Sequence, residues 1–153
     1  MSGCTIMDLG CGYGDLKPFL DQRFSNFHYV GVDFLKEFID GANERYGHST
    51  NAQFIQADFL TAGLPEVDIV IASGSLNYRS LNHLHPWQTI SRMWEVAQKG
   101  VAFNLLDAQV FVADDVLCGY QPKEVLDFCR EMDAKAELVS GYLVDDFTVL
   151  MRK

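Results

Sequence analysis

Strand-like and helix-like segments alternate along this chain, and the alternation restricts its fold more than any other feature. Apolar runs typical of strands occur at residues 5–9, 28–32, 53–57, 68–72 and 101–106. Between these runs, apolar residues recur at helical spacing, most clearly at residues 35–46. Regular alternation of this kind predicts a parallel sheet with helices on both faces.

Local signals indicate where the helices begin and end. Asp15 precedes a short helical segment at residues 16–20 and is a candidate for its N-terminal cap. Pro86 stands where the first turn of the next-to-last helix tolerates a proline, and Gly100 is expected just past the end of that helix. Pro122 opens the last predicted helix in the same way.

The C-terminal part of the chain breaks the alternation. Residues 136–142 and 146–152 are both strand-like, and the link between them is too short for a crossover helix. Two such strands are expected to pair antiparallel at the edge of the sheet. The sequence therefore predicts an α/β fold with a doubly wound sheet of seven strands, mostly parallel, with an antiparallel edge hairpin.

Length and charge limit the classes of function. The 153 residues fit one domain, and the formal net charge is −9. Nucleic-acid surfaces need clustered Lys and Arg, so this charge argues against a general nucleic-acid-binding protein. The sequence holds no apolar stretch of membrane-spanning length. Its four cysteines form no CxxC pair, which favours reduced thiols in a cytoplasmic protein and argues against a metal site.

Three glycines follow the first strand at every second residue. In the stretch IMDLGCGYG, Gly10, Gly12 and Gly14 separate the strand from the first predicted helix. Glycine lets the backbone turn sharply and lets a ligand approach without meeting a β-carbon. Open parallel sheets bind their ligands at this edge, where the strands end. The alternative is a strand–helix turn in which the glycines serve geometry alone.

The spacing of this loop discriminates among nucleotide ligands. The dinucleotide fingerprint GxGxxG needs a glycine where Asp15 stands, and an acid at a helix start repels a pyrophosphate. The GxxxxGK[ST] loop that cradles phosphates is absent from the sequence. Asp8 and Asp15 instead favour a ligand that carries positive charge, such as an ammonium or a sulfonium group.

Two further acids stand at predicted strand ends. Asp33 ends the second strand, where a carboxylate suits the two hydroxyls of a ribose. The alternative for Asp33 is a cap on the helix that follows. Asp58 ends the third strand, where it is a candidate acceptor for an adenine amino group, and Phe34 and Phe59 are candidates to flank the base.

The motifs IMDLGCGYG, GVDF, QADFL and VDIVIASGSLNY occur in an order that resembles the class I S-adenosylmethionine-dependent methyltransferases. The closing stretch DDFTVLMRK resembles the last strand of that family, so the likeness extends over most of the chain. The glycine motif is specific, whereas the later motifs gain weight from their order and spacing. The resemblance implies a Rossmann-like fold and S-adenosyl-L-methionine as cofactor.

The resemblance also implies roles for particular residues. The glycine loop, with Cys11, matches the segment that holds the methionine part of the cofactor. Asp8 matches the acid that helps to place its amino group, and the carbonyls around Ala72 and Ser73 match those near the same group. Asp33 matches the ribose-binding acid. Asp58 matches the acid on the adenine side.

Two departures from the family pattern affect the expected site. Members commonly carry a helix before the first strand, whereas here that strand begins almost at Met1. Residues 1–153 are therefore expected to form a single cofactor-binding domain without that cover helix, with an open site and mobile rim loops at 75–84 and 107–121. The fourth strand is followed by SGSLNY and not by [DNS]PP[YFW], which argues against base-flipping on nucleic acids.

The expected chemistry is direct methyl transfer to a small-molecule acceptor, with a general base needed only when the acceptor loses a proton. Candidate residues on the acceptor side lie after the fourth and fifth strands: Asn77, Tyr78, His83, His85 and Asp107. The alternative for Tyr78 is a role in packing, and the alternative for His85 is a cap on the helix that follows it. The second function considered is a cofactor-binding module without catalytic competence, and the third is an NAD-dependent oxidoreductase. The acceptor atom and the oligomeric state stay open.

Overall fold

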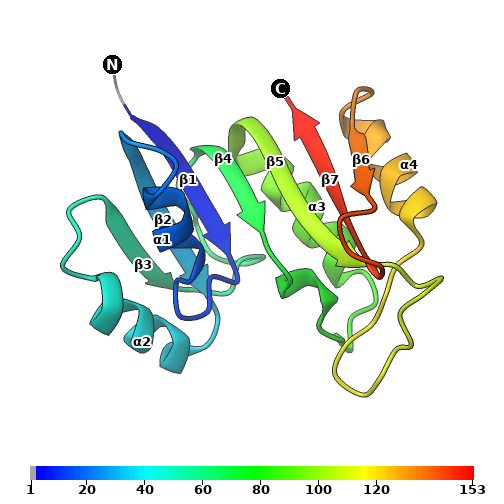
Figure 1. The fold of residues 1–153 in the computed structure, drawn as a ribbon, viewed down its shortest axis with the longest axis horizontal. Helices are drawn as coiled ribbons and strands as arrows, with labels where there is room; N and C mark the ends of the chain where they lie inside the picture. Colours follow the sequence, from blue (N-terminus) through cyan, green and yellow to red (C-terminus); the bar gives the residue numbers. More distant parts are fainter. Residues whose placement is uncertain (1–2) are drawn as a thin grey trace.

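The computed structural model describes residues 3–153, which form a seven-stranded sheet in the order β3-β2-β1-β4-β5-β7-β6 (Figure 1). The strands are β1 (Cys4–Leu9), β2 (Phe27–Asp33), β3 (Ala52–Gln56), β4 (Val67–Ala72), β5 (Ala97–Leu106), β6 (Glu137–Ser140) and β7 (Asp146–Arg152). The pairs from β3 to β5 are parallel, whereas β7 pairs antiparallel with β5 and with β6. The predicted fold class is confirmed, including the antiparallel edge.

Helices lie on both faces of this sheet. They are α1 (Leu16–Asp21), α2 (Lys36–Tyr46), α3 (His85–Val96) and α4 (Pro122–Met132), with a short 3-10 helix η1 (Ser75–Asn77) after β4. α1 and α2 lie near β1, β2 and β3, α3 lies behind β4 and β5, and α4 lies beside β6 at the other end of the sheet (Figure 1). The strand order reverses between β1 and β4, which is the switch point where open sheets bind ligands.

The larger core lies between the sheet and the helices α3 and α4. Strand residues Met7, Val70, Phe103 and Phe147 pack there with Ile90, Met93, Val125 and Cys129. A smaller cluster under α1 joins Ile6, Leu20, Phe27 and Tyr29. Burial of this apolar surface stabilises the arrangement by roughly 25 cal/mol per Å². The two clusters fix the strand ends that surround the switch point.

The predicted end of α3 is wrong at Gly100. The helix ends at Val96, and β5 begins at Ala97 without an intervening loop. Gly100 therefore lies inside β5, where it pairs with Arg152 of β7. A β-carbon on Gly100 would lie 2.7 Å from the backbone oxygen of Met151. The glycine permits the close approach of β7, a contact that no local helix signal reports.

Asp15 does not cap α1 as predicted. Its side chain makes no capping hydrogen bond. Instead, its Oδ1 atom accepts a hydrogen bond from the Arg45 guanidinium of α2, over 2.9 Å. The helix is only six residues long, and its start is held by the backbone bond from Lys17 N to the Gly14 carbonyl.

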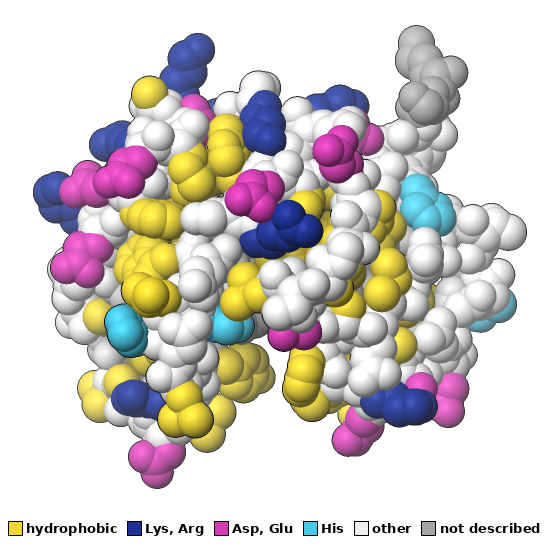
Figure 2. All heavy atoms as spheres, turned by 180° about the vertical axis from the view of Figure 1, so that it is seen from behind, with side chains coloured by type: hydrophobic (Ala, Val, Ile, Leu, Met, Phe, Trp, Pro, Cys, Tyr) yellow, Lys and Arg dark blue, Asp and Glu magenta, His cyan; other side chains and the backbone are white. Residues whose placement is uncertain are grey.

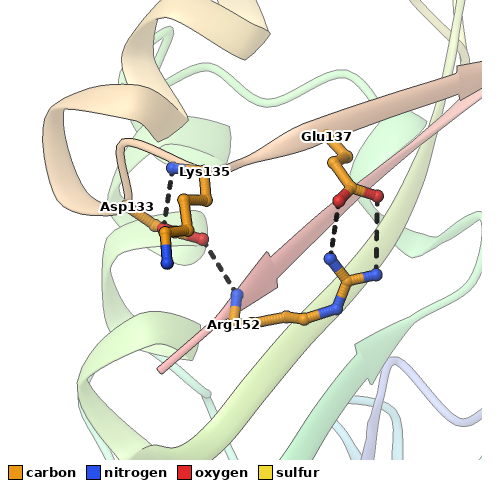
Figure 3. A network of polar contacts seen from close by, with 4 residues as sticks. All are labelled: Asp133, Lys135, Glu137 and Arg152. Carbon is orange, nitrogen blue, oxygen red and sulfur yellow. Dashed lines mark hydrogen bonds and ion pairs between the residues drawn. The ribbon is translucent and has the colours of Figure 1, made fainter.

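The C-terminal edge of the sheet is held by polar contacts (Figure 3). Arg152 of β7 forms an ion pair with Glu137 of β6 over 2.8 Å. Asp133, just past α4, accepts hydrogen bonds from the backbone nitrogens of Lys135 and Arg152, over 3.0 and 2.9 Å. The short strand β6 is thereby tied to β7 and to the end of α4.

No helix among residues 3–153 is both long enough and apolar enough to cross a membrane. Within the same range, no three or more His, Cys, Asp or Glu side chains converge in a way that suits a metal ion. The four cysteines are free thiols, with Cys11 and Cys129 buried and Cys4 and Cys118 half-buried.

Candidate active site

A cavity of about 1150 Å³ opens where β1, β2, β3 and β4 end. The residues that line it include Asp8, Gly10, Cys11, Gly12, Tyr13, Asp15, Asp33, Phe34, Asp58, Phe59, Leu60, Ser73, Gly74, Ser75, Leu76, Tyr78, His85 and Thr89. The space-filling view shows a hollow at the lower edge of the molecule with hydrophobic side chains on both flanks (Figure 2). Most of the predicted cofactor residues therefore meet around one cavity.

The glycine loop has a backbone that other residues seldom adopt. Gly10 and Gly12 have positive φ angles of 70° and 52°. A β-carbon on Gly10 would lie 2.2 Å from the β-carbon of Ser75, whereas one on Gly12 would meet no atom within 4 Å. Ser75 also donates a hydrogen bond from Oγ to the Leu9 carbonyl, over 2.7 Å. Gly10 thus permits contact with the β4 loop, and Gly12 leaves open space in the cavity wall.

This difference makes a matched pair of substitutions. Gly10→Ala is expected to lower the free energy of unfolding by about 2–5 kcal/mol, because left-handed strain adds to the collision with Ser75. Gly12→Ala is expected to cost about 1–2 kcal/mol of strain alone and to weaken S-adenosylhomocysteine binding at least tenfold by filling ligand space. Chemical denaturation and calorimetric titration measure the two effects. Native affinity in Gly12→Ala would assign the glycines to the turn alone.

Asp33 ties the end of β2 to the glycine loop. Its Oδ2 atom accepts a hydrogen bond from Gly12 N, and its Oδ1 atom accepts one from Leu35 N, both over 2.9 Å. The second bond is a turn contact before α2, although it is Leu35, not Asp33, that occupies the helix cap position. Asp33 therefore has a structural role where β2 meets the glycine loop. Asp33 also lines the cavity, so its structural role leaves it within the candidate site.

Asp8 is a buried acid at the end of β1. Only 3% of its surface is exposed, and the Tyr29 hydroxyl donates a hydrogen bond to its Oδ2 atom. The pKa of Asp8 is raised to about 6: burial is the main cause, the hydrogen bond from Tyr29 opposes the rise, and the charge of Asp33 adds to it. Among residues 3–153, no cation pairs with Asp8, and a buried carboxylate of this kind in a cavity wall is typical of a ligand site. Its position suits a positively charged ligand group.

The residues predicted for the adenine side, Phe34, Asp58 and Phe59, line the same cavity. The Asp58 carboxylate accepts a hydrogen bond from Leu60 N over 3.0 Å, which fixes the turn after β3. Phe34 and Phe59 both line the cavity, and they differ in exposure at 69% and 9%. Phe59 belongs to the core, whereas Phe34 presents an apolar ring to the cavity and to solvent. An exposed aromatic ring in a cavity wall is a candidate to stack on a flat ligand group.

Helix α2 packs against the glycine loop. A β-carbon on Gly41 would lie 2.6 Å from the ring of Tyr13, so the tyrosine packs directly on the helix backbone. The Tyr13 ring also meets Phe38 edge-on at 4.9 Å between centroids, and the Arg45 guanidinium lies over it at 4.9 Å. Together with the Arg45–Asp15 ion pair, these contacts hold the loop from the side of α2.

Asn104, which was not predicted from the sequence as a site residue, holds the loop after β4. Asn104 of β5 accepts a hydrogen bond from Gly74 N at 2.7 Å and donates one to Asp146 Oδ2 at 2.8 Å. Ser73 lines the cavity as predicted, whereas Ala72 is buried at the end of β4 and is not among the lining residues. The signal was the single polar residue inside the apolar stretch VAFNLL.

The structure separates the acceptor-side candidates. Tyr78 and His85 line the cavity, whereas Asn77, His83 and Asp107 are not among the lining residues. Asn77 is buried, and its side-chain oxygen accepts a hydrogen bond from Leu106 N over 2.9 Å. Its amide therefore braces the end of β5, which is a structural role.

The two predicted rim loops are joined to each other. The backbone nitrogen of Arg79 donates to the Val116 carbonyl over 2.8 Å, and Cys118 N donates to the Asn77 carbonyl over 2.9 Å. Residues 75–84 and 107–121 thus form one hydrogen-bonded rim, which we call the acceptor rim. Its mobility stays a prediction.

Comparison with known proteins agrees with this arrangement. The profile of a family described as methyltransferase domain matches residues 6–100. The Mycobacterium tuberculosis protein named "Putative methyltransferase Rv1506c" is 31% identical over 157 aligned positions, which cover 97% of this chain and 93% of that protein. A trans-aconitate 2-methyltransferase of Yersinia pseudotuberculosis is 32% identical over 99 residues, 63% of this chain and 35% of the enzyme. The match thus spans about a third of that enzyme's length.

Solved structures share the fold. Magnesium protoporphyrin IX methyltransferase from Synechocystis PCC 6803, with bound SAH, has a TM-score of 0.76 at 15% identity, covering 99% of this chain and 74% of that one. A SAM-dependent methyltransferase from Methanosarcina mazei has a TM-score of 0.74 at 15% identity, and the match covers 100% of this chain and 93% of that one. The domain match, the near-full-length relative and the common fold show that this chain belongs to the class I S-adenosylmethionine-dependent methyltransferase family, as its sequence motifs predict.

Proposed function

We propose that this chain binds S-adenosyl-L-methionine in the cavity at the ends of β1 to β4 and transfers its methyl group to a small-molecule acceptor. The observation that carries the proposal is the convergence of the glycine loop with Asp8, Asp33 and Asp58, which come from three successive strand ends. We further propose that residues 1–153 act as a single domain. Free thiols are typical of reducing compartments, so we place the protein in the cytoplasm.

Each cofactor-side residue has a proposed role. Asp8 faces the amino group, and the carboxylate of Asp33 accepts the ribose hydroxyls with the lone pairs that Gly12 N and Leu35 N leave unused. Asp58 accepts from the adenine amino group, and the base lies beside Phe34. The backbone around Gly10, Cys11 and Ser73 surrounds the methionine part. Gly14 is not among the lining residues; a β-carbon there would meet Phe54 and Tyr46, so its role is in the turn.

The chain's own contribution to the reaction is positioning and the exclusion of water. When bound, the cofactor supplies an activated methyl group on a positively charged sulfur. The residues of the cavity orient the acceptor in line with that group, which removes most of the entropic part of the barrier. A proton acceptor is needed only when the acceptor atom carries a proton, and His85 is the imidazole that lines the cavity.

A binding module without catalytic competence is the second candidate. The observation that favours it is the high exposure of Phe34 and Tyr78, at 69% and 61%, on the two sides of the cavity. An open site excludes water poorly. Methyl transfer under conditions where the cofactor binds distinguishes the two functions.

Cofactor choice is tested by titration. Calorimetry of this chain with S-adenosylmethionine, S-adenosylhomocysteine and NAD in parallel is expected to show saturable binding of the first two. NAD is expected to bind at least tenfold more weakly, because its pyrophosphate meets Asp15 at the helix start. Saturable NAD binding with no response to S-adenosylhomocysteine would contradict the proposal.

A further inference from the structure

The two halves of the cavity differ in charge. The half at the ends of β1, β2 and β3 carries four carboxylates, on Asp8, Asp15, Asp33 and Asp58. The half formed by the β4 loop, η1 and the start of α3 is lined by Ser73, Gly74, Ser75, Leu76, Tyr78, His85 and Thr89. In the described part of the chain, no Lys or Arg lines either half. An acceptor in the second half therefore meets hydroxyls, one imidazole and apolar groups.

Three arginines, in α2, in α3 and in the loop after η1, already have partners. Arg45 pairs with Asp15 over 2.9 Å, and Arg92 pairs with Glu95 over 3.0 Å. Arg79 donates from Nε to the Asp114 carbonyl, and its charge helps to hold the pKa of Asp114 below the ordinary value, after the bonds from two backbone nitrogens. A carboxylate acceptor in the second half would therefore lose its hydration without gaining a cationic partner from the lining.

The acceptor rim exposes large apolar side chains among its polar and charged residues. Six of its large side chains are exposed: Tyr78, Leu81, Leu84, Val110, Val112 and Val116. Leu81 is fully exposed and Val112 is 86% exposed. The acceptor rim adjoins the cavity, because Tyr78 and His85 line the cavity. Leu81 and Leu84 lie between these two residues in the sequence. Exposed apolar surface beside a cavity is typical of a ligand site.

His85 brings an imidazole to the cavity. It is half-buried at the start of α3, and its carbonyl accepts a hydrogen bond from Thr89 Oγ1 over 2.8 Å, which fixes the first helical turn. Both residues line the cavity. Imidazole is the side chain most often used as a general base near neutral pH.

We infer that the methyl acceptor is an uncharged hydroxyl compound with an apolar body and not a polycarboxylate. This inference rests on the proposed methyl transfer. The acceptor oxygen forms its bond to the methyl carbon as the carbon–sulfur bond breaks with its electron pair on sulfur. The hydroxyl proton goes to the imidazole of His85 and from there to solvent. The acceptor therefore differs in class from the substrate that names the trans-aconitate relatives.

Binding of two probes of the same shape tests the acceptor class. The protein is saturated with S-adenosylhomocysteine and titrated by calorimetry with 1-naphthol and with 1-naphthoate at pH 8. 1-Naphthol is expected to bind at least tenfold more tightly. Equal or tighter binding of 1-naphthoate, or no binding of 1-naphthol, overturns the inference. Failure of S-adenosylhomocysteine to bind in the first step would instead reject the proposed function.

Methyl transfer tests the role of His85 and the exclusion of polycarboxylates. Radiolabelled S-adenosylmethionine is expected to methylate 1-naphthol and not trans-aconitate; the reverse result overturns the inference.

His85→Gln is expected to slow 1-naphthol methylation about 100-fold or more. The dissociation constants of S-adenosylhomocysteine and 1-naphthol are each expected to change less than threefold. The same variant is expected to methylate 4-nitro-1-naphthol, which is already ionised at pH 8, at close to the native rate. Equal losses with the two naphthols would reject His85 as the proton acceptor.

Discussion

Asp33→Ala is expected to weaken S-adenosylhomocysteine binding by about tenfold to several hundredfold, the largest loss of affinity among single changes in this site. Hydrogen bonds to a charged group contribute roughly 1.5–3 kcal/mol each, and a ribose offers two hydroxyls. The same change is expected to lower the free energy of unfolding by about 1–3 kcal/mol, because Gly12 N and Leu35 N lose their acceptor. Calorimetric titration and chemical denaturation measure the two losses separately.

Asp133 supplies a matched control for the structural part of this effect. Like Asp33, it accepts one hydrogen bond from the backbone nitrogen two residues later and one from a distant strand or loop (Figure 3). Unlike Asp33, it lies at the C-terminal edge and is not among the cavity-lining residues. Asp133→Ala is therefore expected to lose similar stability while its affinity for S-adenosylhomocysteine stays within twofold of the native value.

Asp33→Asn extends the test. The amide keeps one acceptor oxygen and loses the charge, so its affinity is expected to lie between those of the native protein and Asp33→Ala. If Asp33→Ala and Asp133→Ala both lost stability and neither lost affinity, Asp33 would be a structural residue only. The main support for a ribose-containing ligand would then be gone.

Asp8→Asn is expected to have opposite effects on binding and stability. Each pKa unit corresponds to about 1.4 kcal/mol, so a rise from 3.8 to about 6 makes ionised Asp8 cost the folded protein about 3 kcal/mol at neutral pH. The neutral amide removes this cost while it keeps an oxygen for the Tyr29 hydroxyl. We expect a gain of about 1–3 kcal/mol in stability at pH 7 and a loss of tenfold or more in affinity for S-adenosylhomocysteine.

The pH dependence distinguishes this explanation from a packing effect. Because the folded-state pKa of Asp8 lies above the unfolded-state value, its contribution to stability is fully present below pH 3.8 and is lost as the pH rises through about 6. The gain from Asp8→Asn should therefore be present at pH 7 and absent near pH 4. In the native protein, affinity for the cationic ligand should increase as the pH rises through about 6, and in Asp8→Asn this increase should disappear.

Tyr29→Phe serves as the control for this pair. It removes the hydroxyl that donates to Asp8 while it preserves the ring that packs against Phe54, at 5.7 Å between centroids. The midpoint of the pH-dependent affinity should move upward, because the ionised carboxylate loses its donor. Urea denaturation and calorimetry at pH 4, 5, 6 and 7 measure all three proteins. A stability gain in Asp8→Asn that is equal at every pH would assign the effect to packing.

Most of the fold was predictable because its signals are local. Helical spacing at residues 35–46 and the apolar runs before Gly10 and Asp33 predicted elements close to α2, β1 and β2. The short link before residue 146 predicted the antiparallel edge, since no crossover helix fits there. Gly100 was misplaced for the opposite reason. Its function is to admit β7, and β7 is a neighbour only in the folded sheet.

The sequence alone determined the family, the order of the elements and the position of the cavity. Turn chemistry and hydrophobic periodicity act over a few residues, so IMDLGCGYG and the acids at strand ends carry this information without tertiary contacts. The tertiary structure decided which of the candidate side chains meet. The register that pairs Asp8 with Gly31 and Ile6 with Tyr29 brings the tyrosine hydroxyl to Asp8.

The same reason explains the role of Asn77. It stands in the stretch SGSLNY, beside Tyr78, and by sequence both are candidates to face the acceptor. Only the tertiary fold places the end of β5 against η1, where the side chain of Asn77 binds Leu106 N while Tyr78 lines the cavity. A buried backbone nitrogen needs an acceptor, and which side chain supplies it depends on the packing of elements that are distant in sequence.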